Sequence, residues 1–173
     1  MHFFDVVEKR RSVRVFTGAS VEAGKLETVL ATATLAPSAG DLQAYRIVVI
    51  DDAVTKKALA AAALDQDFVA EAALVLVFCA DPGRSETRYG QRGASLYCIQ
   101  DATIAACYAQ LAAAAQGLAS CWVGAFDEAR VAAVLGAPPG LRPVMLMPIG
   151  YAGEAPERPH RRALEALVHR GAW

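Results

Sequence analysis

The sequence predicts an α+β or α/β domain in which helices surround a mixed β-sheet. Runs of branched apolar residues alternate along the chain with alanine-rich segments at helical spacing, which indicates strands and helices in turn. A long segment at 95–116 is apolar around most of its circumference, as expected for a helix in a deep core or a subunit interface. We expect residues 1–173 to form a single domain, because the chain has one domain's length and shows no repeat or linker.

The first half of the chain is divided by apolar periodicity and by turn residues. Leu26, Leu30 and Ala33 recur at helical spacing, and Ser20 is the expected N-cap of that helix. The elements expected before residue 80 are a short helix from Phe3 to the arginines near residue 10, a helix at about 20–33, a loop at 37–41, a buried strand at 45–50, a helix at 54–64 and a buried strand at 74–79.

The second half is expected to begin with the longest irregular stretch, residues 81–93, which is polar and rich in glycine and arginine. Loops of this length are usually functional or mobile. The long apolar helix follows, and Gly117 is expected to cap its C-terminus. The remaining predicted elements are a short strand at 120–123, a helix at 127–135 capped by Asp127, a turn at 136–140, a buried strand at 144–149 and a last helix from about Ala163.

The overall charge argues against large anionic partners. The formal net charge is −1, so the surface is not built to attract nucleic acid or anionic lipid. The longest alanine-rich stretch, 102–115, is too short and too polar to span a bilayer, and the acidic residues Asp5 and Glu8 argue against a secretory signal. We therefore expect a cytoplasmic protein with no nucleic-acid or membrane partner.

The cysteines indicate a reducing compartment rather than a disulfide framework or a metal site. They form no C-x-x-C pair and have no histidines at ligand spacing. Cys121 lies in an apolar strand, and we interpret it as a structural thiol because reactivity needs an exposed, electropositive setting. The four cysteines are Cys79, Cys98, Cys107 and Cys121.

The strongest functional signal is a cluster of arginines at residues 10–14, Arg-Arg-Ser-Val-Arg. Arginine presents a planar fork of donors that suits phosphate, and the hydroxyl of Ser12 adds a further donor. A second basic pair, Arg161-Arg162, lies near the C-terminus. If the two ends of the chain meet, these residues form a phosphate clamp. The alternative is a set of solvated arginines at a helix end, where cations are favoured in any case.

The sequence lacks the motifs of several other chemistries. It has no G-x-G-x-x-G after a strand, no G-x-x-x-x-G-K-S/T, no G-x-S-x-G and no conspicuous pair of carboxylates. A phosphate clamp without a protein nucleophile or a metal suggests that a cofactor carries the chemistry. A cofactor with one phosphate and a large flat ring would suit this pattern.

In these residues the chain resembles the nitroreductase family of flavin mononucleotide (FMN) enzymes over nearly its full length. The motif at 10–16, R-R-S-V-R-V-F, matches the family's R-R-S-x-R-x-F, and the loop A-P-S-A-G-D-L-Q-A-Y-R at 36–46 is similar to A-P-S-A-G-N-x-Q-P-W-R. The segment 100–126 resembles the family's central helix together with the strand that follows it. The segment 148–165 resembles the family's closing segment. Four motifs in the family's order make the resemblance specific.

The resemblance implies an intertwined homodimer of α+β subunits, each with a mainly antiparallel sheet flanked by helices, and two FMN sites at the subunit interface. The phosphate would be held by Arg10, Ser12, Arg14 and Arg161 or Arg162, with Arg11 nearby. The partner's Pro37, Ser38 and Ala39 would cover one side of the flavin, and Gln43 belongs to the same loop. Gln66 would bind the pyrimidine edge, and the backbone of Val123, Gly124 and Ala125 would approach the flavin N5.

The implied activity is reduction of a nitroaromatic or quinone-like acceptor, with NADH or NADPH as the transient electron donor in a two-electron ping-pong reaction through the flavin N5. The resemblance implies no catalytic side chain, because the flavin is the reactive group. The alternatives are a specialised relative that cleaves flavin, dehalogenates or oxidises azolines, and a non-catalytic flavin carrier or sensor. Asp41 stands where the family often has asparagine and Ala44 where proline is common. The sequence leaves open the preferred nicotinamide, the acceptor and whether 81–93 forms a lid.

Overall fold

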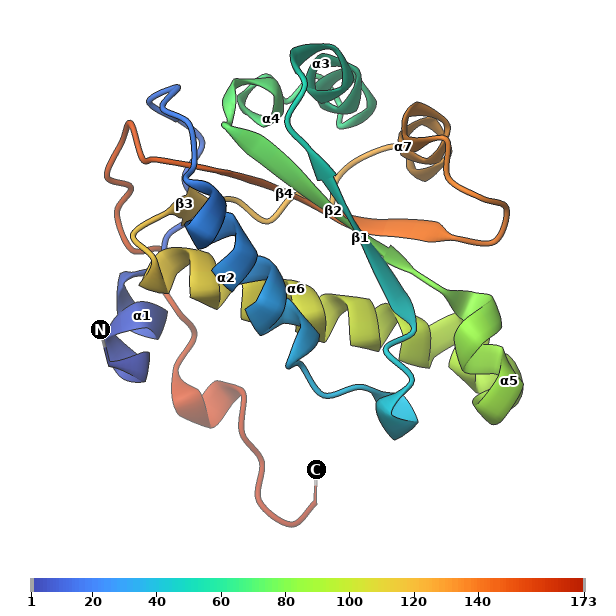
Figure 1. Ribbon diagram of the computed structural model, residues 1–173. Helices are drawn as coiled ribbons and strands as arrows, with labels where there is room; N and C mark the ends of the chain where they lie inside the picture. Colours follow the sequence, from blue (N-terminus) through green and yellow to red (C-terminus); the bar gives the residue numbers. More distant parts are fainter. Residues whose placement is uncertain (1, 173) are drawn as a thin grey trace.

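The computed structural model describes residues 2–172 and places a four-stranded sheet between two layers of helices (Figure 1). The strands are β1 (Tyr45–Ile50), β2 (Leu74–Ala80), β3 (Ala119–Ser120) and β4 (Arg142–Gly150). Their order across the sheet is β1-β2-β4-β3, and each neighbouring pair is antiparallel. This pairing decides between the two fold classes left open by the periodicity: the protein is α+β.

Each face of the sheet carries its own core. One core joins the sheet to α6 (Cys98–Ala115) and α2 (Ala23–Thr34), which packs on α6. The other lies under α3 (Ala53–Ala62), α4 (Phe68–Glu71) and α7 (Glu128–Leu135). Strand β2 is buried along its whole length, since it is central in the sheet and covered on both sides. Its continuous apolar run is the pattern that buried strands require.

The remaining elements lie at the ends of these layers. The N-terminal α1 packs near the end of α6, and the C-terminal tail passes close to α1 in Figure 1. The elements are α1 (Phe3–Lys9), the single 3₁₀ turns η1 (Ala39–Asp41) and η3 (Leu164–Ala166), α5 (Pro82–Arg92) and the π-helical turn η2 (Gly93–Tyr97).

Several predicted elements are confirmed with small changes of boundary, and others are wrong. The expected irregular stretch at 81–93 is instead helix α5, which Asp81 caps by accepting a hydrogen bond from the backbone N–H of Arg84 at 3.1 Å. Proline at the first helical position favours this start. Ser20 is not an N-cap, because α2 begins after Glu22. In place of the predicted last helix the structure has only the turn η3. In place of the predicted strand at 120–123 it has the two-residue strand β3 and a separate bridge between Val123 and Leu146.

Helix α6 is buried on one side and open on the other. Gly117, with a φ of 75°, ends it in the left-handed conformation, and the N–H of Leu118 returns to the carbonyl of Ala113 at 2.9 Å. Nine of its residues are buried, Ala106 among them. The open side carries a mostly apolar stripe, which we call the α6 stripe: Thr103, Ile104, Cys107, Tyr108, Leu111, Ala114 and Ala115.

Candidate functional site

The arginine cluster leaves α1 as an extended segment along β3. Arg10 is the C-cap of α1, and its φ of −55° and ψ of 130° turn the chain out of the helix. Ser12 then forms a parallel bridge with Ser120, and the N–H of Val13 donates to the Ser120 carbonyl at 3.1 Å. The cluster is thereby fixed beside the strand that follows α6.

The two ends of the chain meet at a cavity of about 510 Å³, which we call the clamp cavity. The residues that line it come from the N-terminal segment and from the tail: Val7, Glu8, Arg10, Arg11, Ser12, Arg14, Pro156, Glu157, Arg158, Pro159 and Arg161. The tail is tied to α1 by an ion pair between Arg158 and Glu8, with 3.4 Å between nitrogen and oxygen. The structure thus brings together the two basic groups that sequence alone left apart.

The structure also distinguishes the two C-terminal arginines. Arg161 lines the clamp cavity. Arg162 is not part of this lining, and its guanidinium donates to the carbonyl of Ala166 at 2.7 Å, within the tail itself. Arg11 lines the cavity but also donates to the carbonyl of Arg10 at 3.0 Å, at the end of α1.

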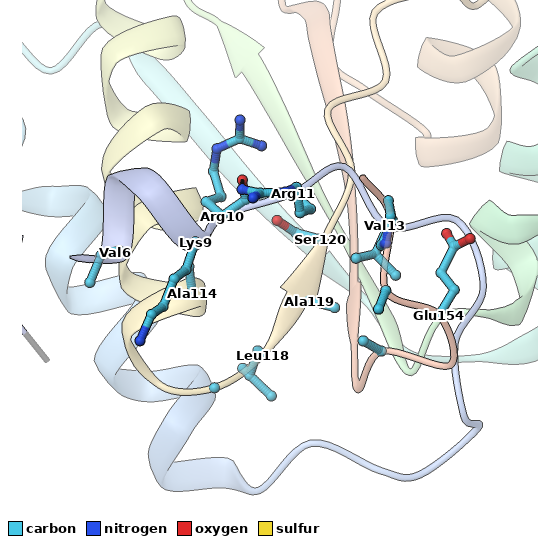
Figure 2. A pocket seen from close by; sticks show the side chains of 14 residues that line it. Val6, Lys9, Arg10, Arg11, Val13, Ala114, Leu118, Ala119, Ser120 and Glu154 are labelled. Atoms are coloured by element: carbon cyan, nitrogen blue, oxygen red, sulfur yellow. Dashed lines mark hydrogen bonds between the residues drawn. The ribbon is translucent and has the colours of Figure 1, made fainter. Parts of the chain in front are cut away.

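A second cavity of about 420 Å³ shares Arg10, Arg11 and Pro156 with the clamp cavity. Figure 2 shows it between the end of α1, the turn after α6 with β3, and the segment that carries Glu154. The Glu154 carboxylate accepts hydrogen bonds from the backbone N–H groups of Arg14 at 2.6 Å and Val15 at 3.1 Å. This carboxylate fixes the backbone at the end of the arginine cluster, and sequence analysis missed it.

The segment Val123–Ala125 and Gln66 lie at this same end of the molecule. The Gln66 amide nitrogen donates to the carbonyls of Ala125 at 3.0 Å and Ala63 at 2.7 Å. The Arg14 guanidinium stands 5.9 Å from the centre of the Phe68 ring, at the start of α4. A Cβ added to Gly124 would meet no atom nearer than Trp122 Nε1, at 3.9 Å, so this backbone faces open space. The groups therefore border one region.

Cys121 directly follows β3 and is a buried thiol. Burial is the largest influence and raises its pKa, while the charges of Arg14 and Arg10 act in the opposite direction. A raised pKa keeps the sulfur protonated, and a protonated thiol is a poor nucleophile. The interpretation of Cys121 as structural is consistent with this environment.

The loop at 37–43 is not brought to the clamp within one subunit. Ala39 donates its N–H to the Asp101 carboxylate at 2.9 Å, in the first turn of α6, whereas Ala114 near the other end of α6 lines the cavity beside the clamp. At 1.5 Å per residue, these two positions are about 20 Å apart along the helix. An open cavity of about 550 Å³ lies at the loop, lined by Pro37, Ser38, Ala39, Tyr97, Ile99, Gln100, Asp101, Thr103 and Ile104.

Comparison with known proteins assigns the chain to a family. The sequence profile of the Nitroreductase family matches residues 7–66 and 60–151. The chain belongs to the nitroreductase family. It is 35% identical to a NADH dehydrogenase of Thermus thermophilus, over 92% of this chain and 91% of that protein. It is 30% identical to a putative NADH dehydrogenase/NAD(P)H nitroreductase of Archaeoglobus fulgidus, over 84% of this chain and 83% of the relative.

A solved structure shares the fold of this nitroreductase family member. The NADPH:FMN oxidoreductase of Vibrio harveyi, in complex with NAD⁺, superposes with a TM-score of 0.91 at 28% identity, over 99% of this chain and 77% of that one. The sequence-based assignments of the family and of an α+β fold with a mainly antiparallel sheet are confirmed.

Two further observations concern residues 2–172 of this family member. No group of three or more histidine, cysteine, aspartate or glutamate side chains is placed there to hold a metal ion. None of the helices described is both long enough and apolar enough to cross a membrane.

Proposed function

We propose that the protein is an FMN-dependent NAD(P)H oxidoreductase that works as one FMN-binding domain in each subunit. The clamp cavity is the observation that carries the proposal. Arginines from both ends of the chain surround a cavity that is open to solvent, and the sequence has no G-x-G-x-x-G motif for a dinucleotide. Guanidinium groups bind a terminal phosphate through charge-assisted, often bidentate hydrogen bonds.

The residues at the clamp fit the phosphate of FMN. Arg10, Ser12, Arg14 and Arg161 hold it in this proposal, and Arg11 stabilises the end of α1 beside it. Arg162 is less suited than Arg161 to bind the phosphate, because its guanidinium already donates to the carbonyl of Ala166. Glu154 has a different part in this proposal: its carboxylate accepts the N–H of Arg14 and so fixes the backbone beside the clamp, but it does not bind the phosphate.

The flat ring fits the open region next to the clamp. The exposed backbone at Gly124, between Val123 and Ala125, lets a planar group approach closely and would contact the flavin N5. The Gln66 amide nitrogen is already engaged, which leaves its carbonyl oxygen to accept a hydrogen bond from the pyrimidine edge.

We propose that a second copy of the chain completes each site. The α6 stripe leaves an apolar face open to solvent, which is unfavourable for an isolated subunit and typical of an interface. A dimer with two-fold symmetry could place Pro37, Ser38, Ala39 and Gln43 of one subunit over the flavin held by the other subunit's clamp. The distance between loop and clamp within one chain supports this sharing.

When bound, FMN supplies two-electron redox chemistry at its N5 atom. The protein's own residues bind the phosphate, present backbone at the ring and leave the outer face accessible. NADH or NADPH serves as electron donor and leaves before a nitroaromatic or quinone-like acceptor enters, which is ping-pong exchange at one open face. The putative NADH dehydrogenase/NAD(P)H nitroreductase of Archaeoglobus fulgidus and the NADPH:FMN oxidoreductase of Vibrio harveyi, to which this chain is similar, support this reaction class. We place the enzyme in the cytoplasm, where its free cysteines would stay reduced.

The cofactor gives the first test. We expect the purified protein to be yellow and to release FMN, not flavin adenine dinucleotide, on denaturation, as measured by chromatography against both standards. Rapid mixing with NADH or NADPH should then bleach the flavin absorbance. Recovery of the dinucleotide, or no flavin uptake on reconstitution, contradicts the proposal. Bound FMN that neither nicotinamide reduces would indicate a flavin carrier.

A further inference from the structure

The loop that follows α2 has an unusual backbone. Gly40, Asp41 and Gln43 have φ values of 56°, 55° and 47°, so three of four consecutive residues are left-handed. Glycine adopts this region freely, and aspartate tolerates it, as asparagine does. For Gln43 it is unfavourable. Such conformations persist when the surroundings fix them, and they concentrate at functional sites.

Helix α6 fixes the loop from inside the subunit through Asp101, whose side chain is almost fully buried. One carboxylate oxygen, Oδ1, accepts the N–H of Ala39 at 2.9 Å. The other oxygen, Oδ2, accepts the N–H of Ala44 at 3.4 Å. A single side chain thus holds both ends of the left-handed stretch. A buried carboxylate is unfavourable unless such donors satisfy it, so its position here has a specific use.

Helix α5 fixes the same loop from the solvent side. The Arg88 guanidinium donates to the carbonyl of Gly40 at 3.1 Å, and the Arg84 guanidinium donates to the carbonyl of Leu42. A Cβ on Gly40 would meet the Tyr89 hydroxyl and the Arg88 guanidinium, so both side chains lie directly against this residue and would have to move for any other one. We call Asp101, Arg84 and Arg88 the loop brace.

We propose that Asp101, with the two arginines of the loop brace, is a positioning residue for the FMN site of the other subunit. The inference rests on the proposed function, because it takes the loop at 37–43 to cover the flavin bound by the partner's clamp. In this proposal Asp101 acts on the flavin through the loop and not by contact with the flavin. It holds the loop in one conformation, in which Pro37, Ser38 and Ala39 present a fixed surface to the flavin. Because the loop is already ordered before the flavin binds, the free energy of ordering it does not weaken flavin binding.

The variant Asp101→Asn tests the need for two acceptors. An asparagine has the same shape but one acceptor oxygen, and its NH₂ group would face the N–H of Ala39 or Ala44. We expect FMN to bind about ten- to a hundredfold more weakly to the variant dimer, measured by titration of flavin fluorescence. The matched control is Asp52→Asn at the N-cap of α3, where asparagine accepts equally well and affinity should not change.

A mixed dimer tests whether the effect acts on the other subunit. One chain carries Asp101→Asn and the other Arg10→Ala, and two different tags allow the mixed species to be purified. The Asp101→Asn chain keeps an intact clamp, and the Arg10→Ala chain keeps an intact loop. Together they should form one site of wild-type affinity per dimer and about half the wild-type turnover, although each parent dimer is impaired. A global folding defect in the Asp101→Asn chain would damage its own clamp and give no such site.

The outcomes of these experiments separate the inference about Asp101 from the proposed function. Wild-type FMN affinity in Asp101→Asn, or a mixed dimer without a good site, overturns the inference while the proposed function stands. Wild-type protein that binds no FMN overturns the proposed function itself. If Asp101→Asn does not fold, the exposed Arg88→Ala replaces it in both experiments, with an expected loss of about three- to tenfold. Unchanged affinity in that variant then overturns the inference.

Discussion

The substitution Arg10→Ala is expected to weaken FMN binding by about one to two factors of ten. A hydrogen bond to a charged group contributes about 1.5–3 kcal/mol, and Arg10 lines both cavities at the junction of the two chain ends. Its side chain is half-buried, so raising the salt concentration should reduce the difference from wild type only in part. Equilibrium titration of apoprotein with FMN at low and high salt measures both quantities.

A matched arginine provides the control for this prediction. Arg130 lies exposed on α7, where its side chain does not line the clamp cavity, and Arg130→Ala should bind FMN as wild type does. Equal affinity for FMN in Arg10→Ala and Arg130→Ala would mean that the arginine cluster is a solvated helix end. That result would remove the main support for the proposed function.

The sequence predicted the fold well where local signals and burial agree. Strands β1, β2 and β4 are apolar runs between turn residues, and they form where expected. It failed at 81–93, where a polar composition concealed a helix. That helix is stabilised by the Asp81 cap and by contacts of Arg84 and Arg88 with a loop more than 40 residues earlier in the chain. Such long-range contacts leave no periodicity in the sequence.

In the candidate site, too, features that depend on nearby residues could be predicted and those that depend on long-range contacts could not. The arginine cluster at 10–14 could be singled out because it depends on residue type and on a short spacing in the chain, whereas its meeting with Arg161 depends on the fold. Glu154 and Asp101 could not, since their hydrogen bonds reach across 140 and 62 residues to backbone N–H groups. A backbone donor has no residue-type signature. Nothing in the sequence marks these two carboxylates as different from solvated ones.

The long apolar helix could be recognised from the sequence, but its orientation could not. Because nearly all faces of α6 are apolar, periodicity does not show which face meets its own subunit. Ala106 is fully buried within the subunit, so it is the wrong position for testing an interface. The α6 stripe supplies better positions, since its residues are exposed or partly exposed in the single chain.

If the proposed dimer forms through this stripe, the substitution Tyr108→Glu is expected to abolish the dimer and FMN binding together. Tyr108 is 37% exposed in the subunit, so a glutamate there remains solvated in a folded monomer. In a two-fold interface the same change would bury two unpaired carboxylates, a cost of several kcal/mol. Sedimentation measured together with flavin absorbance gives both readouts. The control is Val54→Glu on α3, also an exposed apolar residue but on the opposite side of the sheet, which should leave the dimer intact.

Cys107 gives an independent measure of the same interface. Of the four cysteines, all within the described residues, it is the one that is exposed, and it lies next to Tyr108 on the α6 stripe. In the proposed dimer of the wild-type protein the partner should cover Cys107 and slow its reaction with a thiol reagent. In Tyr108→Glu one thiol per chain should react rapidly, while Cys79 stays protected because burial raises its pKa to about 11. A monomeric Tyr108→Glu that keeps wild-type FMN affinity would refute the shared site, since each subunit would then hold the flavin without the partner's loop.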